Sequence, residues 1–233
     1  GILMHYGPNA VTGDIGFCID IGNSKSGSNA TDFVGGQTVT LNNTPTYSSD
    51  GYMSFDGVNE SITIADNSYP SAWTDNFSLE VWVYFPNDID WSNAYRACIL
   101  SRGGYAGSHG LWRHPTDNVI SAWARSGNTS KERTVSITRD AWWHLVMTWE
   151  NDTLIAIYKN GELGSSMDPG DHTAVASANI DTGNWILCGK EAASGAQSQF
   201  YEGRMALARQ YKKALTAAEV KQNFEATRGR FGV

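Results

Sequence analysis

Apolar and polar residues alternate with a period of two in one short segment after another along this chain. The clearest segment is Phe77–Phe85, in which every second residue from Leu79 onwards is apolar and shares one face. Trp82 and Tyr84 occupy the opposite face. Because successive side chains of a β-strand point to opposite sides of its sheet, this pattern predicts a strand that is covered on both faces.

Further runs of this kind are separated by turn signals every ~8–14 residues, a spacing typical of a β-sandwich or β-barrel. The predicted strands are Tyr52–Phe55, Ser61–Ile64, Cys98–Ser101, Gly110–His114, Val119–Arg125, Thr134–Ile137, His144–Trp149, Leu154–Lys159, Trp185–Gly189 and Gly203–Tyr211. Asn160-Gly161 predicts a tight hairpin turn after one of them.

One helix is predicted near the end of the chain. Thr216 and Glu219 have the spacing of a capping box, and Val220 and Phe224 then lie on one helical face. No linker or repeat divides the sequence. We therefore expect one domain over residues 1–233, with an N-terminal arm and long loop at 1–50, a sandwich at 51–215 and a helix at 216–228.

The composition limits the classes of molecule that the chain is expected to bind. Its 233 residues carry a formal net charge of −7, which disfavours nucleic acid and anionic membranes as partners. No apolar run approaches the ~18–20 residues that a membrane-spanning helix needs. Only 18% of the residues are charged, whereas there are 24 glycines and nine tryptophans, a composition that suits an all-β protein with short turns.

The three cysteines, Cys18, Cys98 and Cys188, are far apart and form no metal-binding spacing. An odd number favours three reduced, buried thiols, although one disulfide plus one free thiol stays open. The segment Gly1–His5 lacks the layout of a secretory signal, so we expect synthesis in the cytoplasm.

Several blocks, in a constant order, resemble the laminin-G-like domains of the concanavalin A-like superfamily. The blocks are Met53–Glu60, Phe77–Val83, Trp143–Thr148, Ile157–Leu163, Gly203–Leu207 and Ala214–Glu219. The resemblance implies a two-sheet antiparallel jelly-roll sandwich with one short C-terminal helix.

Other segments resemble jelly-roll domains that tailed phages encode among their virion structural genes. These segments are Gly7–Thr12, Cys18–Ser26, Pro45–Tyr47 and Gln222–Gly232. This resemblance implies a non-enzymatic virion protein, as a capsid decoration or tail-associated subunit. Its expected partners are the major capsid protein or another virion protein and further copies of itself, and its expected location is the virion.

Enzymes share this architecture, but their acidic motifs are missing from the chain. Retaining glucanases of this fold carry several carboxylates on one strand, whereas Glu80 has no second acid in its strand and Asp88-Ile89-Asp90 falls in a predicted loop. No Gly-x-Ser-x-Gly nucleophile motif is present, and His144 fits a packed, hydrogen-bonded residue. We therefore predict no enzymatic activity, and a divergent polysaccharide-degrading enzyme is the least favoured hypothesis.

Glycan binding is the main alternative to a purely structural role. Trp112 and His114 share one face of a predicted strand, and Trp123 and Arg125 share a face of the next. A groove of these four residues would hold a host surface polysaccharide, because sugars stack on exposed aromatic faces. The competing interpretation is that most tryptophans fill the core.

Loop aromatic residues are expected to be exposed at Trp91, Tyr95 and Tyr105, where they would contact a protein neighbour or a sugar.

The family resemblance raises the question of a structural calcium ion. Asp56 matches the family position that often helps to bind Ca²⁺, but Ala206 stands where the closing strand often supplies a second acid. A calcium site needs six to eight oxygen ligands. We therefore expect no metal and no cofactor, and we predict that Asp56 caps its own turn instead.

Overall fold

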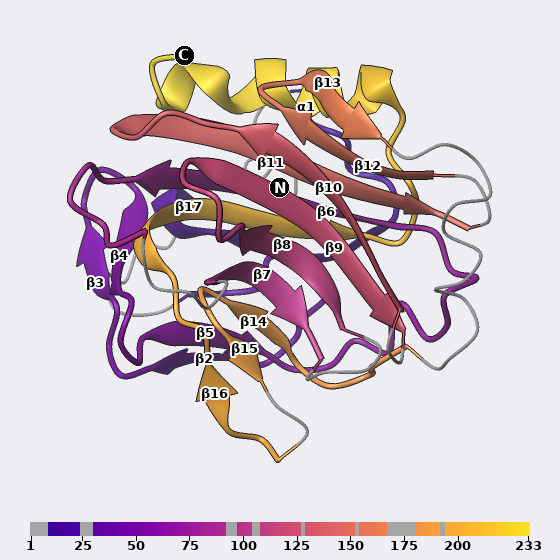
Figure 1. Cartoon of the computed structure of the whole chain (residues 1–233), viewed down its shortest axis with the longest axis horizontal. Helices are drawn as coiled ribbons and strands as arrows, with labels where there is room; N and C mark the ends of the chain where they lie inside the picture. Colours follow the sequence, from indigo (N-terminus) through magenta and orange to yellow (C-terminus); the bar gives the residue numbers. More distant parts are fainter. Residues whose placement is uncertain are drawn as a thin grey trace.

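The computed structural model describes residues 9–23, 30–91, 97–103, 108–126, 129–151, 154–166, 180–191 and 194–233. Two antiparallel sheets face each other, and one α-helix lies outside them near the C-terminus (Figure 1). This arrangement confirms the predicted all-β jelly-roll sandwich. None of the helices in the described ranges is long and apolar enough to cross a membrane.

Sheet A has eight strands in the order β13-β12-β11-β6-β17-β4-β3, and β1 pairs with the half of β17 that β4 leaves open. Its strands are β1 (Ile15–Asp20), β3 (Thr46–Ser48), β4 (Tyr52–Asp56), β6 (Phe77–Phe85), β11 (Ala141–Glu150), β12 (Leu154–Lys159), β13 (Glu162–Ser166) and β17 (Glu202–Tyr211).

Sheet B has seven strands in the order β10-β9-β8-β7-β14-β5-β2. Its strands are β2 (Val39–Asn42), β5 (Ser61–Ile64), β7 (Cys98–Arg102), β8 (His109–Arg113), β9 (Val119–Ser126), β10 (Thr129–Ser136) and β14 (Trp185–Leu187). A small ribbon of β15 (Lys190–Glu191) and β16 (Gln197–Ser198) follows β14, and two 3-10 turns, η2 (Ile21–Asn23) and η4 (Arg228–Arg230), complete the described elements.

The core between the sheets follows the predicted alternation. In β6, Leu79, Val81 and Val83 belong to the central apolar cluster, whereas Trp82 belongs to a separate cluster on the other side of sheet A. All three cysteines are buried and free, which confirms the prediction of reduced, buried thiols.

Two regions differ from the sequence-based expectation. Of the predicted strand Thr134–Ile137, residues 134–136 are the end of the longer β10, which lies at the edge of sheet B. The charged residues earlier in β10 hide its periodicity. Residues 15–20, assigned to an N-terminal arm, form β1, which is buried along its whole length within sheet A. The prediction of an arm is wrong for these residues because β1 pairs with a strand about 190 residues away in sequence. Local patterns carry no information on such a pairing.

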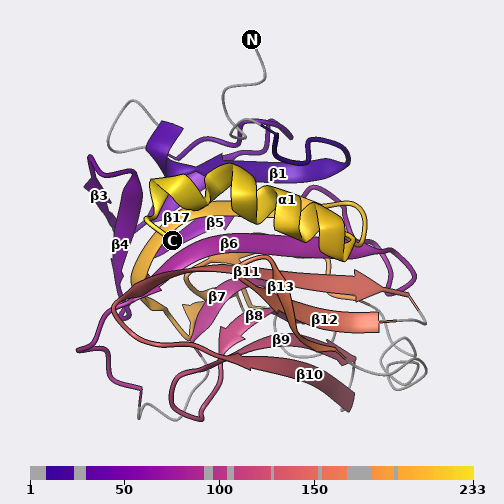
Figure 2. The same ribbon diagram turned by 90° about the horizontal axis from the view of Figure 1, so that it is seen from above.

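The helix α1 (Ala217–Thr227) covers part of the outer face of sheet A (Figure 2). Thr216 caps it as predicted: the Thr216 hydroxyl accepts a hydrogen bond from the Glu219 amide, and the Glu219 carboxylate accepts one from the Thr216 amide. Val220 and Phe224 are buried against the sheet, which confirms the predicted docking face.

Candidate functional site

The four residues predicted to bind glycan lie together on the outer face of sheet B. Trp112 belongs to β8, His114 follows that strand, and Trp123 and Arg125 belong to β9. The Trp112 and Trp123 ring centroids are 4.2 Å apart, and both rings belong to a cluster separate from the central core. His114 Nε2 lies 3.9 Å from a carboxylate oxygen of Glu132 on β10.

The two tryptophans do not present the expected open surface. Trp112 is fully buried and Trp123 is only 8% exposed, so the prediction of an exposed stacking platform is wrong. The physical reason is that the segment after β14 covers this face of sheet B. The Lys190 ammonium lies 4.8 Å from the centre of the Trp112 ring, and the Ser61 hydroxyl donates a hydrogen bond to the Gln197 side chain on the same face. His114 and Arg125 are half-buried, and their contact with a ligand stays a prediction.

Trp91 was expected to be an exposed loop aromatic, and this expectation is also wrong. It is 5% exposed, and its indole nitrogen donates to the carbonyl oxygens of His114 and Thr116 at 3.0 Å. The Arg113 and Arg139 guanidinium groups lie over its ring at 5.1 and 5.3 Å. The other two loop aromatics, Tyr95 and Tyr105, lie outside the described residues.

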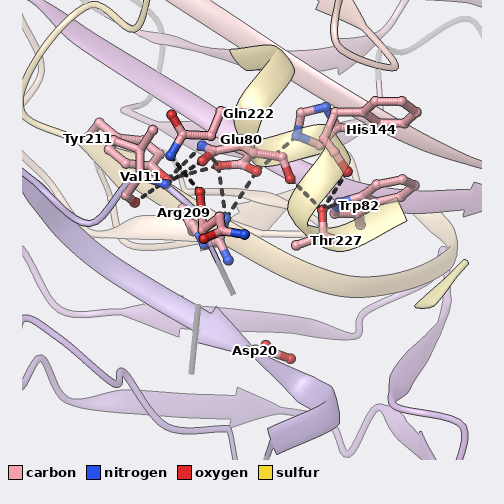
Figure 3. A network of polar contacts seen from close by, with 12 residues as sticks. Val11, Asp20, Glu80, Trp82, His144, Arg209, Tyr211, Gln222 and Thr227 are labelled. Atoms are coloured by element: carbon pink, nitrogen blue, oxygen red, sulfur yellow. Dashed lines mark hydrogen bonds and ion pairs between the residues drawn. The ribbon is translucent and has the colours of Figure 1, made fainter. Parts of the chain in front are cut away.

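Glu80 and His144, which were considered as catalytic candidates, lie beneath α1 in a buried polar network (Figure 3). His144 Nε2 is 2.9 Å from Glu80 Oε1, which confirms the packed, hydrogen-bonded histidine. Arg209 Nη1 donates to the same carboxylate at 3.2 Å, and the Tyr211 hydroxyl donates at 3.1 Å. Burial by itself would raise the pKa of Glu80, but Arg209, His144 and Tyr211 outweigh it and lower this pKa from 4.5 to about 2.

This network joins the helix and the N-terminal segment to sheet A. The Asn223 side chain on α1 donates to Glu80 Oε2 at 2.9 Å and accepts from the Val11 amide at 2.7 Å. The Trp82 indole donates to the Thr227 hydroxyl at 2.9 Å. Glu80 is therefore an ionised, fully buried residue that connects α1 to sheet A, and solvent does not reach its carboxylate.

Asp56 caps its own turn, as predicted. Its Oδ1 accepts hydrogen bonds from the amides of Val58 and Asn59 at 2.8 and 3.3 Å. Within the described ranges, no group of three or more His, Cys, Asp or Glu side chains is arranged to hold a metal ion.

An aromatic surface that the sequence patterns do not indicate lies on the outer face of sheet A, beside the C-terminal end of α1. We call it the aromatic patch; it consists of Tyr52, Tyr84, Trp142 and Phe231, all partly exposed. The Trp142 ring is central, with centroid distances of 5.8 Å to Tyr52, 5.6 Å to Tyr84 and 4.9 Å to Phe231.

The rings of the patch come from β4, β6 and β11 and from Phe231, and β17 lies between β6 and β4. Tyr84 on β6 lies directly opposite Trp142 on β11 and opposite Arg204 on β17. Phe231 follows η4 and stacks on the buried Trp82 at 4.1 Å, so the end of α1 determines its position. Alternation in β6 does place Tyr84 on the outer face, but it does not indicate that α1 covers Trp82 and stops short of Tyr84.

The fold and this surface define a lectin-like β-sandwich with an aromatic face. A model of the concanavalin A-like lectin/glucanase superfamily, of the laminin-G type, matches residues 56–221, and the chain belongs to this superfamily.

Solved structures with the same fold include toxin binding domains. The binding domain of botulinum neurotoxin serotype G has a TM-score of 0.69 at 16% identity, covering 90% of this chain and 50% of that one. The serotype D ligand-binding domain, solved in complex with N-acetylneuraminic acid, has a TM-score of 0.68 at 13% identity, with 91% and 50% covered. The binding domain of Paraclostridial Mosquitocidal Protein 1 has a TM-score of 0.66 at 14% identity, with 91% and 52% covered.

This chain thus spans about half the length of these domains, and the likeness shows the fold alone. No curated protein matches the sequence.

Proposed function

We propose that this protein is a glycan-binding module and that the aromatic patch contacts the sugar. The observation that carries the proposal is the cluster of Tyr52, Tyr84 and Phe231 around Trp142, all partly exposed on a sheet of a lectin-like fold. Clustered apolar rings on a protein surface mark an interaction site.

The chemistry of the patch suits a sugar. The flat face of a sugar ring carries polarised C–H groups, which are attracted to the electron-rich face of an aromatic ring. Polar groups at the rim can then bind the hydroxyls: the Tyr52 phenol and the Arg204 guanidinium lie beside the rings. This combination of apolar surface and a few directed polar groups is typical of small-molecule sites.

The comparisons support this proposal over a purely structural role. The superfamily includes lectins, and the serotype D toxin domain with the same fold was solved with a bound sugar. A host surface polysaccharide, the ligand class of the alternative hypothesis from the sequence, is therefore our proposed partner. The superfamily contains lectins and glucanases, and we propose no catalytic step for this chain.

Glycan-binding assays on two sets of variants test the proposal. The double variant Tyr52→Ala/Trp142→Ala should lose most of its affinity for any polysaccharide that the wild type binds, because it removes the central ring and one neighbour. The matched control is His114→Ala/Arg125→Ala, which alters the partly exposed residues of the other candidate surface. Lost binding in the control with intact binding in the first variant would instead place the site on sheet B.

A virion role rests on the resemblance of the terminal segments to tailed-phage proteins, and we propose it as the biological context of the module. Attachment to the major capsid protein or another virion protein, as a homo-oligomer, is compatible with glycan binding. Mass spectrometry of purified particles from the source tests this context. Tens to hundreds of copies per particle are expected, and absence from the particles would reject the virion role and leave the glycan-binding proposal in place.

A further inference from the structure

Arg204 lies beside the aromatic patch, against the rings of Tyr52 and Tyr84. Its guanidinium carbon is 5.0 Å from the centre of the Tyr52 ring and 4.5 Å from the centre of the Tyr84 ring. The residue opposite it on β4 is Ser54, so both neighbouring strands supply neutral side chains at this position. Among the described residues, the Arg204 cation therefore lies against two aromatic rings and pairs with no carboxylate.

Seven other arginines of the described residues have anionic or carbonyl partners. Five form ion pairs with carboxylates, namely Arg102 with Asp66, Arg139 with Asp117, Arg209 with Glu80, Arg228 with Glu225 and Arg230 with Asp20. Arg113 and Arg133 donate to backbone carbonyl oxygens. Among the described residues, none accepts a hydrogen bond from the Arg204 guanidinium or forms an ion pair with it.

None of the described residues accepts from the N–H donors of Arg204. The N–H groups of a guanidinium lie in its plane, whereas contacts with ring faces use the two sides of that plane. Two parallel N–H groups match the two oxygens of a carboxylate. The Asp140 carboxylate, which accepts from the hydroxyl of the patch residue Tyr84 at 3.1 Å, also accepts from the backbone amide and the side chain of Asn87. This acid therefore has other partners than Arg204.

We propose that the glycan bound on the aromatic patch carries a carboxylate and that Arg204 pairs with it. The inference rests on the proposed function and specifies its ligand class, an acidic glycan. The rings would hold the sugar face, and the guanidinium edge would select the charged substituent. A sugar acid thereby supplies an anionic partner that none of the described residues provides for Arg204.

Matched acid and ester ligands provide the test. Affinities of the intact protein are measured for oligogalacturonate, oligomannuronate and sialyllactose, each as the free acid and as its methyl ester, together with a panel of neutral glycans. The ester keeps the sugar shape and removes the charge. A charge-assisted pair would make at least one acid bind about 10- to 100-fold more tightly than its ester, and added salt would reduce the difference.

Variants of Arg204 identify the responsible group. Arg204→Gln should bring the affinity for the acid down to that of its ester, and Arg204→Lys should keep part of the preference, because it keeps the charge but not the paired donors. Arg228→Gln, at an exposed arginine with a carboxylate partner, is the matched control and should keep the preference.

The outcomes separate the inference from the proposed function. Equal affinity for acids and esters, or a preference that survives in Arg204→Gln, overturns the role of Arg204. Binding of neutral glycans alone overturns the acidic ligand and leaves the proposed function intact. Failure of every glycan in the panel to bind overturns both.

Discussion

Two arginines of the same strand, Arg209 and Arg204, have opposite environments on the same outer face of sheet A. Arg209 is fully buried under α1 and pairs with Glu80, whereas Arg204 is half-buried between two tyrosines with no carboxylate partner among the described residues. The strand and the residue type are identical, so the difference comes from what covers each end of β17. A buried cation needs an anionic partner within the protein, because burying an unpaired charge destabilises the fold. A cation at the surface is hydrated, so its N–H groups can bind a ligand instead.

A register shift makes this comparison possible. The residues are five apart, so strict alternation would place them on opposite faces. The pairing of β17 with β6 shifts between Met205 and Leu207, so that Arg204 faces Tyr84 and Arg209 faces Glu80 on the same side of the sheet. The irregularity thus allows one strand to contribute both to the buried anchor and to the aromatic patch.

The largest effect is expected from removing the buried arginine. Arg209→Met leaves the Glu80 carboxylate buried without its cation, and the free energy of unfolding should fall by about 3–5 kcal/mol. The matched variant Arg204→Met should lower it by only about 1 kcal/mol, since it removes contacts with two rings but leaves no buried charge unpaired. Urea unfolding of the two variants checks this prediction. Equal losses of unfolding free energy would contradict the view that Arg209 is structural and that Arg204 is not.

Acid should weaken the anchored region through Glu80. Its pKa is lowered to about 2 in the folded protein, so the carboxylate stabilises the fold above pH 4.5, and this contribution is lost as the pH falls from 4.5 towards 2. The shift corresponds to about 3 kcal/mol of unfolding free energy. Unfolding measured across this pH range, together with the carboxyl NMR signal of Glu80, tests the prediction; titration of that signal near pH 4.5 would contradict it.

An intermediate effect is expected where the helix meets Trp82. Thr227→Val keeps the side-chain shape but removes the acceptor of the Trp82 indole hydrogen bond, which leaves a buried donor unpaired. The loss should be about 1–3 kcal/mol of unfolding free energy. Thr216→Ser, which retains the cap hydroxyl at the start of α1, serves as a control and should stay close to the wild type.

The smallest effect concerns the contact between Arg204 and its rings. Tyr52→Leu removes one of the two aromatic faces, and a double-mutant cycle with Arg204→Met should give a coupling free energy of about 0.5–1 kcal/mol. Thermal or urea unfolding of the four proteins provides the cycle. A coupling of zero would mean that Tyr52 does not hold the guanidinium.

Local sequence patterns predicted much of the fold because they report on short-range physics. The alternation in Phe77–Phe85 identified β6 with its bounds, and the Thr216–Glu219 spacing identified the start of α1. The start of β10 was not predicted, because its residues do not alternate clearly between apolar and polar. The candidate site was only partly predictable: Trp112 and Trp123 do share one face, but the segment at Lys190 that covers Trp112 is distant in sequence.

By itself the sequence determined the strand pattern, the helix cap and the superfamily. Side-chain alternation, capping and the family blocks each depend only on residues that are close together in the chain. Only the tertiary structure decided which aromatic residues stay accessible. Accessibility depends on what docks on each sheet: α1 buries Trp82 and Glu80 but ends before Trp142, and the segment after β14 buries Trp112. Such docking joins residues far apart in the chain, and no local pattern encodes it.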